Sequence, residues 1–380
     1  METAELLFEI LRSEVNGKPV DTELFRGYDP DQLYKIAQKH DLTYCAADAL
    51  TKAGLLPKEV PAYDSFMKKQ ASIIIRTVRI EEAIERIKET LNGAKIPFVP
   101  LKGARIRAMY PDKMMRSSCD IDILVREEDL DRAVSTLVDH DFTTDGKREY
   151  HDISLYSGKI HLELHFNICE NMEDIDVLLK RVWEFAEPVS EFEYHEKPEF
   201  FVYHHLAHMK YHFVRGGCGI RPFLDLFVMR KAGFYEEEKL AELLETVGLN
   251  AFYQAVLQVI GVWFEGAPQT ELTQKCEEYI LRGGVYGSME NSVAAQSAVQ
   301  NGRIKNVWSI LFPGYESMCN YYPVLKEKKI LLPFYYMKRI VSKVFGKSSK
   351  RVRNRMRTVV LQDQKRIDSV EDLLIKMGIR

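Results

Sequence analysis

The sequence predicts an α+β fold in which a small mixed sheet is preceded and followed by predominantly helical regions. Two observations predict it. Apolar and polar residues alternate with a period of two in segments 119–125 and 159–166, as expected of half-buried strands. Through most of the remaining chain apolar residues recur every three or four positions, which is typical of amphipathic helices. We therefore expect a domain with strands between residues 93 and 190.

The 380 residues are enough for two or three domains. We expect four regions, namely a helical N-terminal region 1–92, a region with strands and helices 93–190, a helical domain 191–300 and a basic helical region 301–380. In the first region, helices are predicted over 4–12, 31–40 and 72–91. Asp29 is the expected N-cap of the second, with Pro30 at its first position, and Asn92-Gly93 ends the third.

Two carboxylates lie two residues apart in a strand-forming run, Asp120 and Asp122. The period of a strand places both on one face, while Ile121, Ile123 and Val125 take the other. Like charges this close repel each other unless a cation or solvent screens them. Because carboxylate oxygens are ligands that Mg²⁺ prefers, this pair is a candidate metal site.

A third acidic residue, Glu163, projects from the polar face of segment 159–166. The preceding segment 152–157 is also strand-like, and Ser157-Gly158 is suited to a hairpin turn between the two. Helices are expected over 127–140 and 176–185.

A short apolar strand over 97–101 is followed by Lys102-Gly103 and by a predicted helix over 104–110. A glycine between a strand and a helix lets a phosphate approach the backbone N–H groups, and the lysine adds positive charge. We expect Lys102 and Gly103 to bind phosphate.

The order Leu101-Lys102-Gly103, Tyr110-Pro111, Arg116 and Asp120-Ile121-Asp122, with an acidic strand residue further on, resembles the polymerase-β-like nucleotidyltransferase superfamily. More narrowly it is similar to the uncharacterised nucleotidyltransferases, and the similarity extends to segments 208–225 and 311–333. One departure is Lys102-Gly103-Ala104, where the superfamily has Gly-Ser or Gly-Gly.

The resemblance implies transfer of a nucleoside monophosphate from an NTP to a hydroxyl group of an unidentified acceptor. Asp120, Asp122 and Glu163 would be the catalytic and metal-binding residues, with Mg²⁺ as the cofactor and Mn²⁺ as the alternative. Glu163 would complete the metal site or accept the proton of the attacking hydroxyl. Phosphates would contact Lys102 and Gly103, with Arg116 and Ser117 as further phosphate-binding candidates.

Other functions stay open. One is a toxin-like nucleotidyltransferase acting on tRNA or protein. Another is a non-catalytic scaffold, which the departure after Gly103 favours. A third is a hydrolytic zinc site, because His204, His208 and His212 recur every four residues on one helical face, although no H-E-x-x-H motif is present. Arg221 and Asp225, four residues apart, are interpreted as an ion pair.

The segment 337–357 carries nine lysines and arginines and no acid. Such a segment suits nucleic acid, an anionic membrane surface or an acidic partner, and the plain alternative is a solvated tail. The net charge of −3 predicts no global attraction to nucleic acid. Six dispersed cysteines without a Cys-x-x-Cys pair argue against a zinc ribbon or disulfide framework, and neither a signal peptide nor a membrane span is recognised. We expect a cytoplasmic protein.

Overall fold

A computed structural model describes residues 2–299, 312–322, 324–345, 354, 357–359, 361 and 363–379. The chain forms two compact units. The first contains residues 1–211 and 220–273, and the second contains residues 212–219 and 274–380. The predicted α+β class is confirmed, because helices dominate both units and a four-stranded sheet lies in the first.

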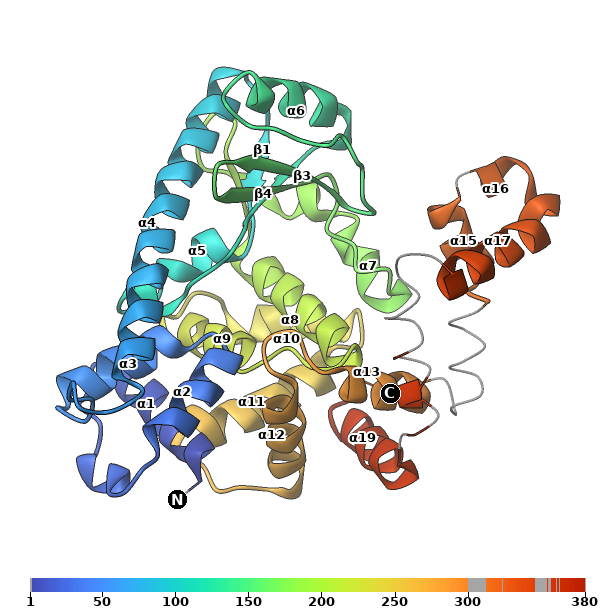
Figure 1. The fold of residues 1–380 in the computed structure, drawn as a ribbon. Helices are drawn as coiled ribbons and strands as arrows, with labels where there is room; N and C mark the ends of the chain where they lie inside the picture. Colours follow the sequence, from blue (N-terminus) through green and yellow to red (C-terminus); the bar gives the residue numbers. More distant parts are fainter. Residues whose placement is uncertain are drawn as a thin grey trace. The chain divides into compact units, whose positions relative to one another are not determined.

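The sheet has the strand order β1-β2-β4-β3. It lies beside α6 Leu130–Val138 in Figure 1, where β1, β3 and β4 are labelled. The strands are β1 Phe98–Pro100, β2 Ile121–Val125, β3 Asp152–Ser157 and β4 Ile160–His165. β2 and β4 are parallel, whereas β1 pairs with β2 and β3 pairs with β4 in the antiparallel sense. The mixed sheet expected between residues 93 and 190 is thus present.

The hairpin of β3 and β4 forms as predicted, with its turn one residue later than expected. Ser157 pairs with Ile160, so the two loop residues are Gly158 and Lys159. Gly158 has a φ of 58°, a conformation that glycine adopts without steric cost. This turn fixes the register that opposes Ser154 to Glu163.

One face of the sheet is apolar and supplies the core of the first unit. Ile121, Ile123 and Val125 of β2 point to this face, as predicted from the period of two. Leu162 and Leu164 of β4 lie beside them. α4 Tyr63–Gly93 and α6 Leu130–Val138 cover the face, and the buried members they contribute are Ile80, Ala83, Ile84, Ile87, Leu91, Leu130, Ala133 and Leu137. The other face is left for polar side chains.

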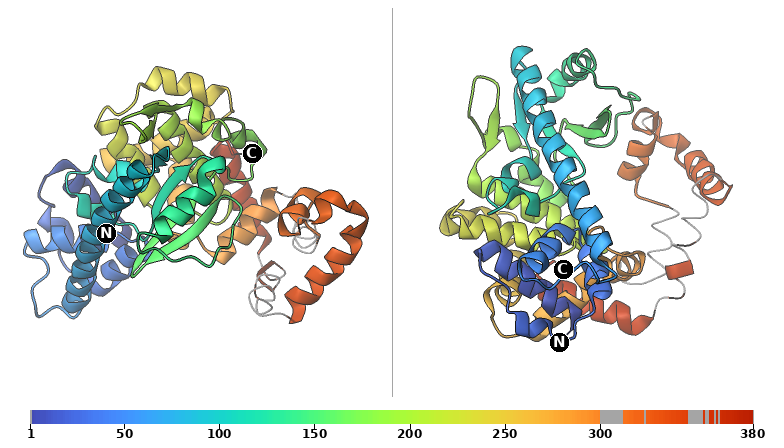
Figure 2. Two further views of the ribbon diagram at one scale, coloured as in Figure 1. Left: turned by 90° about the horizontal axis from the view of Figure 1, so that it is seen from above. Right: turned by 60° about the vertical axis from the view of Figure 1, so that its left-hand side comes forward.

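α4 is longer than the predicted helix over 72–91, and both views in Figure 2 show it running past the sheet. Its first turns pack on the N-terminal helices rather than on the sheet. Phe66 is fully buried there, with its ring 5.0 Å edge-on from that of Tyr34. Because tertiary packing extends the helix, the periodicity over 72–91 revealed only the part that covers the sheet.

The other elements of the first unit are α1 Thr3–Asn16, η1 Thr22–Phe25, α2 Pro30–Lys39, α3 Thr43–Lys52, α5 Gly103–Arg107, η2 Lys113–Met115, η3 Glu127–Asp129, α7 Glu173–Leu179, η4 Val182–Glu184, β5 Ala186–Pro188, β6 Tyr194–Glu196, α8 Pro198–Val214, α9 Arg221–Lys231, α10 Glu237–Glu245 and α11 Asn250–Glu265, where α8 continues three residues into the second unit. Asp29 caps α2 by accepting hydrogen bonds from the N–H groups of Asp31 and Gln32, as predicted. The helix predicted over 176–185 instead begins at Glu173, because Asp176 accepts hydrogen bonds from the N–H groups of Glu170 and Met172 and fixes the chain ahead of it.

The second unit contains the elements α12 Glu271–Gly283, whose first residues belong to the first unit, α13 Met289–Val299, α15 Tyr315–Tyr321, α16 Val324–Glu327, η5 Lys329–Leu331, α17 Leu332–Phe345 and α19 Gln364–Lys376. Much of the predicted basic segment 337–357 lies outside the described residues. Among the helices that the structure describes, none combines the length and apolar character that crossing a membrane requires.

Candidate active site

The polar face of the sheet brings Asp122 and Glu163 side by side. They occupy the same register position on the neighbouring parallel strands β2 and β4. Ser154 of β3 is opposite Glu163 on the next strand. A row of polar side chains therefore crosses three strands on the face away from the apolar core.

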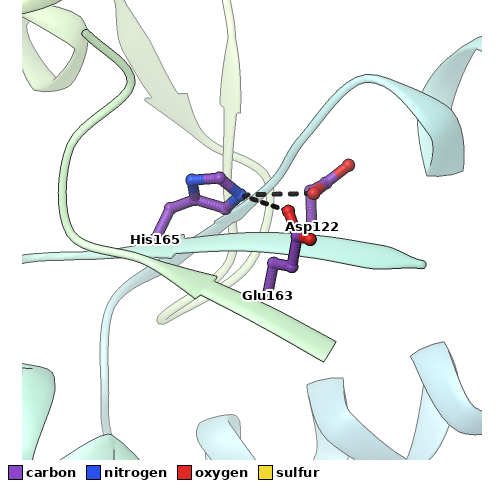
Figure 3. A group of neighbouring side chains, drawn as sticks. All are labelled: Asp122, Glu163 and His165. Atoms are coloured by element: carbon purple, nitrogen blue, oxygen red, sulfur yellow. Dashed lines mark hydrogen bonds and ion pairs between the residues drawn. The ribbon is translucent and has the colours of Figure 1, made fainter. Parts of the chain in front are cut away.

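His165 joins the two carboxylates and completes a compact cluster (Figure 3). Its Nε2 lies 3.2 Å from Asp122 Oδ1 and 3.7 Å from Glu163 Oε2. One ligand atom from each of the three residues lies within 4.8 Å of the others. In the part of the chain that the structure describes, this is the group of acidic and histidine side chains with the spacing of a metal site.

The two carboxylates differ in their proton affinity. Burial raises the pKa of Glu163 to about 7, and the charge of Asp122 contributes in the same direction. Burial also acts to raise the pKa of Asp122, but the hydrogen bond with His165 and the charges of His165 and Lys102 outweigh it, so the pKa falls below its usual range. One charged and one easily protonated carboxylate share the site, as expected for neighbouring acids.

Asp120 lies one residue before β2 and is half-buried. Burial and then the charge of Asp122 raise the pKa of Asp120, which shows that the two carboxylates interact. Asp120 also raises the pKa of Glu163. The three predicted acidic residues therefore belong to one electrostatic group, with Asp120 outside the tightest cluster.

The ring of His165 is held in place by a neighbouring ring. His151 stacks on it with the ring centroids 5.3 Å apart and the planes 1° from parallel. The Nδ1 of His165 is buried and has no hydrogen-bond partner among the residues that the structure describes. Nε2 is therefore the ring nitrogen of His165 that makes a hydrogen bond, and when it carries a proton it donates to Asp122 Oδ1.

The turn at Lys102 and Gly103 is attached directly to the acidic strand. The N–H of Leu101 donates to the carbonyl oxygen of Asp122 over 3.0 Å, continuing the pairing of β1 with β2. Lys102 has a φ of 21°, which L-residues rarely adopt. Its charge contributes to lowering the pKa of Asp122. The charge of Lys102 thus reaches Asp122, and Gly103 is the next residue of the same turn.

The helix after this turn is shorter than predicted. α5 ends at Arg107 instead of Tyr110. Pro111 has no N–H with which to continue a helix, and the Tyr110 hydroxyl instead donates to Asp225 Oδ1 over 2.7 Å. Because α5 has only five residues, a phosphate here would depend on the turn itself and on nearby cations rather than on a long helix.

Gly103 makes room for the guanidinium of Arg116. A Cβ added at Gly103 would lie 3.1 Å from Arg116 Nη1, closer than side chains ordinarily pack. The Nε and Nη2 atoms of Arg116 donate to the two oxygens of Asp225 over 3.1 and 3.0 Å. The absence of a side chain at Gly103 and the position of Arg116 are therefore linked.

Ser117 and Arg221 share a second carboxylate, that of the half-buried Asp41. Ser117 Oγ donates to Asp41 Oδ2 over 2.8 Å, and Arg221 Nη2 donates to the same oxygen. The interpretation of Arg221 and Asp225 as an ion pair is wrong, because Asp225 pairs with Arg116 instead. Arg116 lies close to Gly103, but the hydrogen bonds that the Arg116 and Ser117 side chains donate go to the carboxylates of Asp225 in α9 and of Asp41 in the loop after α2.

The histidines of α8 bind separate carboxylates. His204 Nδ1 lies 2.8 Å from Glu196 Oε1, and His208 Nδ1 lies 2.6 Å from Glu170 Oε1. His212 belongs to the second unit. Among the described residues these histidines form no three-ligand group, whereas the charge of His208 reaches Asp122 and contributes to lowering its pKa. His208 is therefore an electrostatic neighbour of the acidic cluster.

Sequence reasoning did not assign His165, Asp41 or Glu170 to the site. The sequence pattern could have identified His165, because it is two residues from Glu163 on the same polar face of the strand. Asp41 and Glu170 carry no local signal. Their partners Arg221 and His208 are 180 and 38 residues away in the sequence.

A small mixed sheet that gathers carboxylates beside a lysine–glycine turn is the arrangement expected of a nucleotidyltransferase. The sequence model of the family described as uncharacterised nucleotidyltransferase matches residues 26–265, and the chain belongs to this family. The predicted resemblance is thus confirmed, although segment 311–333 lies outside the matched residues. Comparison with curated proteins and with solved structures found no match.

Proposed function

We propose that the protein transfers a nucleoside monophosphate from an NTP to a hydroxyl group of an acceptor, using Mg²⁺ or, alternatively, Mn²⁺. The observation that carries this proposal is the register pairing of Asp122 with Glu163, whose ligand atoms cluster with that of His165. Family membership supports the same class of reaction.

The donor set fits a hard divalent cation. Asp122 and Glu163 offer carboxylate oxygens, and Asp120 is close enough to interact with both. A histidine that binds a metal through Nε2 normally donates its Nδ1–H to an acceptor, and His165 has no such acceptor among the described residues. This favours oxygen ligands with His165 as a hydrogen-bond donor, which suits Mg²⁺ better than zinc.

A bound divalent cation would neutralise charge that develops on the phosphates. The residues of the chain position the cation, the phosphates and the attacking hydroxyl. Asp120, Asp122 and Glu163 would hold the cation, or Glu163 would instead accept the proton of the attacking hydroxyl at a carboxylate oxygen. The hydroxyl oxygen forms the new bond to the α-phosphorus, and pyrophosphate leaves as the bond to the β-phosphate breaks. His165 orients Asp122 through its Nε2. Lys102 and the N–H of Gly103 bind the phosphates, with Arg116 and Ser117 as further phosphate-binding candidates.

Nucleotide binding by purified variants tests this proposal. Asp122→Asn and Glu163→Gln keep the side-chain shape and remove a charge, so each should weaken Mg²⁺-dependent binding of a non-hydrolysable NTP by about 100-fold or more. Isothermal titration with all four nucleotides measures the loss. Asp131→Asn is the matched control, because it removes an exposed acid from α6 in the same unit and should bind like the wild type.

The remaining alternatives give different results. If no nucleotide produces heat in Mg²⁺ or Mn²⁺ with the wild type, a non-catalytic scaffold is favoured and the proposal is wrong. If the variants bind as the wild type does, the assignment of the carboxylates is wrong. Labelling of tRNA or of a protein from radioactive NTP would favour the toxin-like activity and identify the acceptor.

A further inference from the structure

A row of apolar side chains is exposed on the second unit along η5 and α17. Ile330, Phe334, Met337 and Val341 expose 89%, 63%, 62% and 52% of their surface. Their spacing of four, three and four residues places them on one side of a helix. A continuous exposed row of this kind marks a surface for binding, unlike single exposed apolar residues.

The opposite side of α17 is fixed by packing. Leu332, Tyr335 and Tyr336 pack against a small core made by Met318, Cys319 and Leu325. The Tyr336 hydroxyl also donates to the carbonyl oxygen of Pro313 over 2.6 Å. α15, α16 and α17 lie together in Figure 1. Because this core orients the helix, the exposed row stays on the outside.

Basic residues lie close to the exposed row in the sequence. From residue 324 to 345 the sequence has six of them, Lys326, Lys328, Lys329, Lys338, Arg339 and Lys343, against the single acid Glu327. Lys329 Nζ lies 4.7 Å from the centre of the Tyr315 ring, and the Arg339 guanidinium lies 4.4 Å from that of Tyr321. These contacts place cations near the core of the α15–α17 group.

We propose that this surface, the exposed row with its flanking lysines, binds to the surface of a bilayer that contains anionic lipids. Headgroups would meet the lysines while the acyl region accepts Phe334 and Met337. RNA would satisfy the charges but offers no apolar region for Ile330 or Val341. The 14 residues of α17 extend about 21 Å, less than the roughly 30 Å of the hydrocarbon core, so the helix would lie in the interface.

Vesicle sedimentation with the full chain tests this inference. We expect binding to phosphatidylcholine vesicles that contain about 30% phosphatidylglycerol, little binding to pure phosphatidylcholine, and a loss of binding as salt is raised. Phe334→Ser with Met337→Ser should lower the partition coefficient at least about tenfold, because the apolar contribution is lost. Lys326→Glu with Lys328→Glu should lower it similarly through charge. Circular dichroism confirms that these surface variants are folded.

The matched control is Ile75→Ser with Val78→Ser, which removes apolar residues of α4 that are 52% and 41% exposed and should leave vesicle binding unchanged. Several results would overturn the inference. They are no binding to anionic vesicles, equal binding to neutral ones, loss of binding in the α4 control alone, or a dimer in solution that the Phe334 and Met337 variant converts to monomer. Lysine-dependent binding of single-stranded RNA without vesicle binding would also overturn it.

Discussion

Asp225 accepts three hydrogen bonds in the interior of the first unit. Two come from Arg116 and one from Tyr110, and the Asp225 side chain is nearly inaccessible. Burial acts to raise the pKa of Asp225, but the charges of Arg116 and His205 outweigh it and hold the pKa below its usual value. A buried pair of this kind is tolerated because both partners are satisfied.

Replacing Asp225 by alanine should therefore destabilise the protein strongly. The guanidinium of Arg116 would stay buried without its carboxylate, which typically costs about 3–5 kcal/mol. Urea denaturation followed by circular dichroism measures the free energy of unfolding. Asp145→Ala is the control, because the Asp145 carboxylate is exposed and contacts Lys147 in the same loop. Equal stability of the two variants would contradict the structural role of Asp225.

Single residues were predictable from the sequence where local spacing decides their position. Asp122 and Glu163 each lie on the polar face of a strand, and an alternating pattern reveals that face from a few neighbouring residues. Ion-pair partners were not predictable in this way. Arg116 and Asp225 are 109 residues apart, and nothing near either one identifies the other.

α4 connects the N-terminal helices to the sheet through a continuous buried side. Phe66 packs near Tyr34, whereas Ile87 and Leu91 belong to the core beneath the strands. Because one rigid helix contributes to both regions, its packing should determine much of the stability of the first unit.

Truncating Ile87 to alanine should lower the free energy of unfolding by about 2–5 kcal/mol. Ile87 is fully buried in the core, and the substitution removes apolar contacts and leaves a cavity. The matched control on the same helix is Ile75→Ala, which is 52% exposed and should change stability by no more than about 0.5 kcal/mol. Thermal or urea denaturation compares them, and similar effects of the two substitutions would show that α4 does not pack as described.

The type of most elements was predictable, but their ends were not. The β3–β4 hairpin was found from two alternating segments and a glycine. α4 extends further and α5 ends earlier than their periodicity indicated. In both cases a residue distant in the sequence determines where the helix begins or ends. Tyr34 packs on the start of α4, and Asp225 binds Tyr110 just after α5.

At the scale of the whole molecule, acid should destabilise the protein through carboxylates that are paired with arginines in the folded state. Burial acts to raise the pKa of Asp41, but Arg221 and Ser117 outweigh burial, so the pKa is lowered. The pKa of Asp225 is lowered in the same way by Arg116. A carboxylate with a lowered folded pKa contributes stability that is complete above its unfolded value, ordinarily 3.8, and is lost as the pH falls through the folded value.

We therefore expect the stability difference between the wild type and Asp41→Asn with Asp225→Asn to be largest above pH ~4 and to shrink as the pH falls further. Urea titrations at a series of pH values measure this difference. A difference that does not change with pH would mean that neither carboxylate has a lowered pKa in the folded protein.

The sequence indicated the α+β class and the resemblance to a family, and the matched residues 26–265 fall mostly within the first unit. It did not reveal that the helices before and after the strands join the sheet in one compact unit. Periodicity identifies the apolar side of each helix, but not the surface against which that side is buried.

The parallel pairing of β2 with β4 has a consequence for synthesis on the ribosome. A carboxylate on the earlier strand meets its neighbour on the later one only after the intervening helix and hairpin have been made, since 41 residues separate position 122 from position 163. Parallel strands need such a long crossover, and closing it comes at an entropic cost. A chain interrupted before residue 160 therefore lacks β4, and with it Glu163 and His165, whatever helices it has already formed.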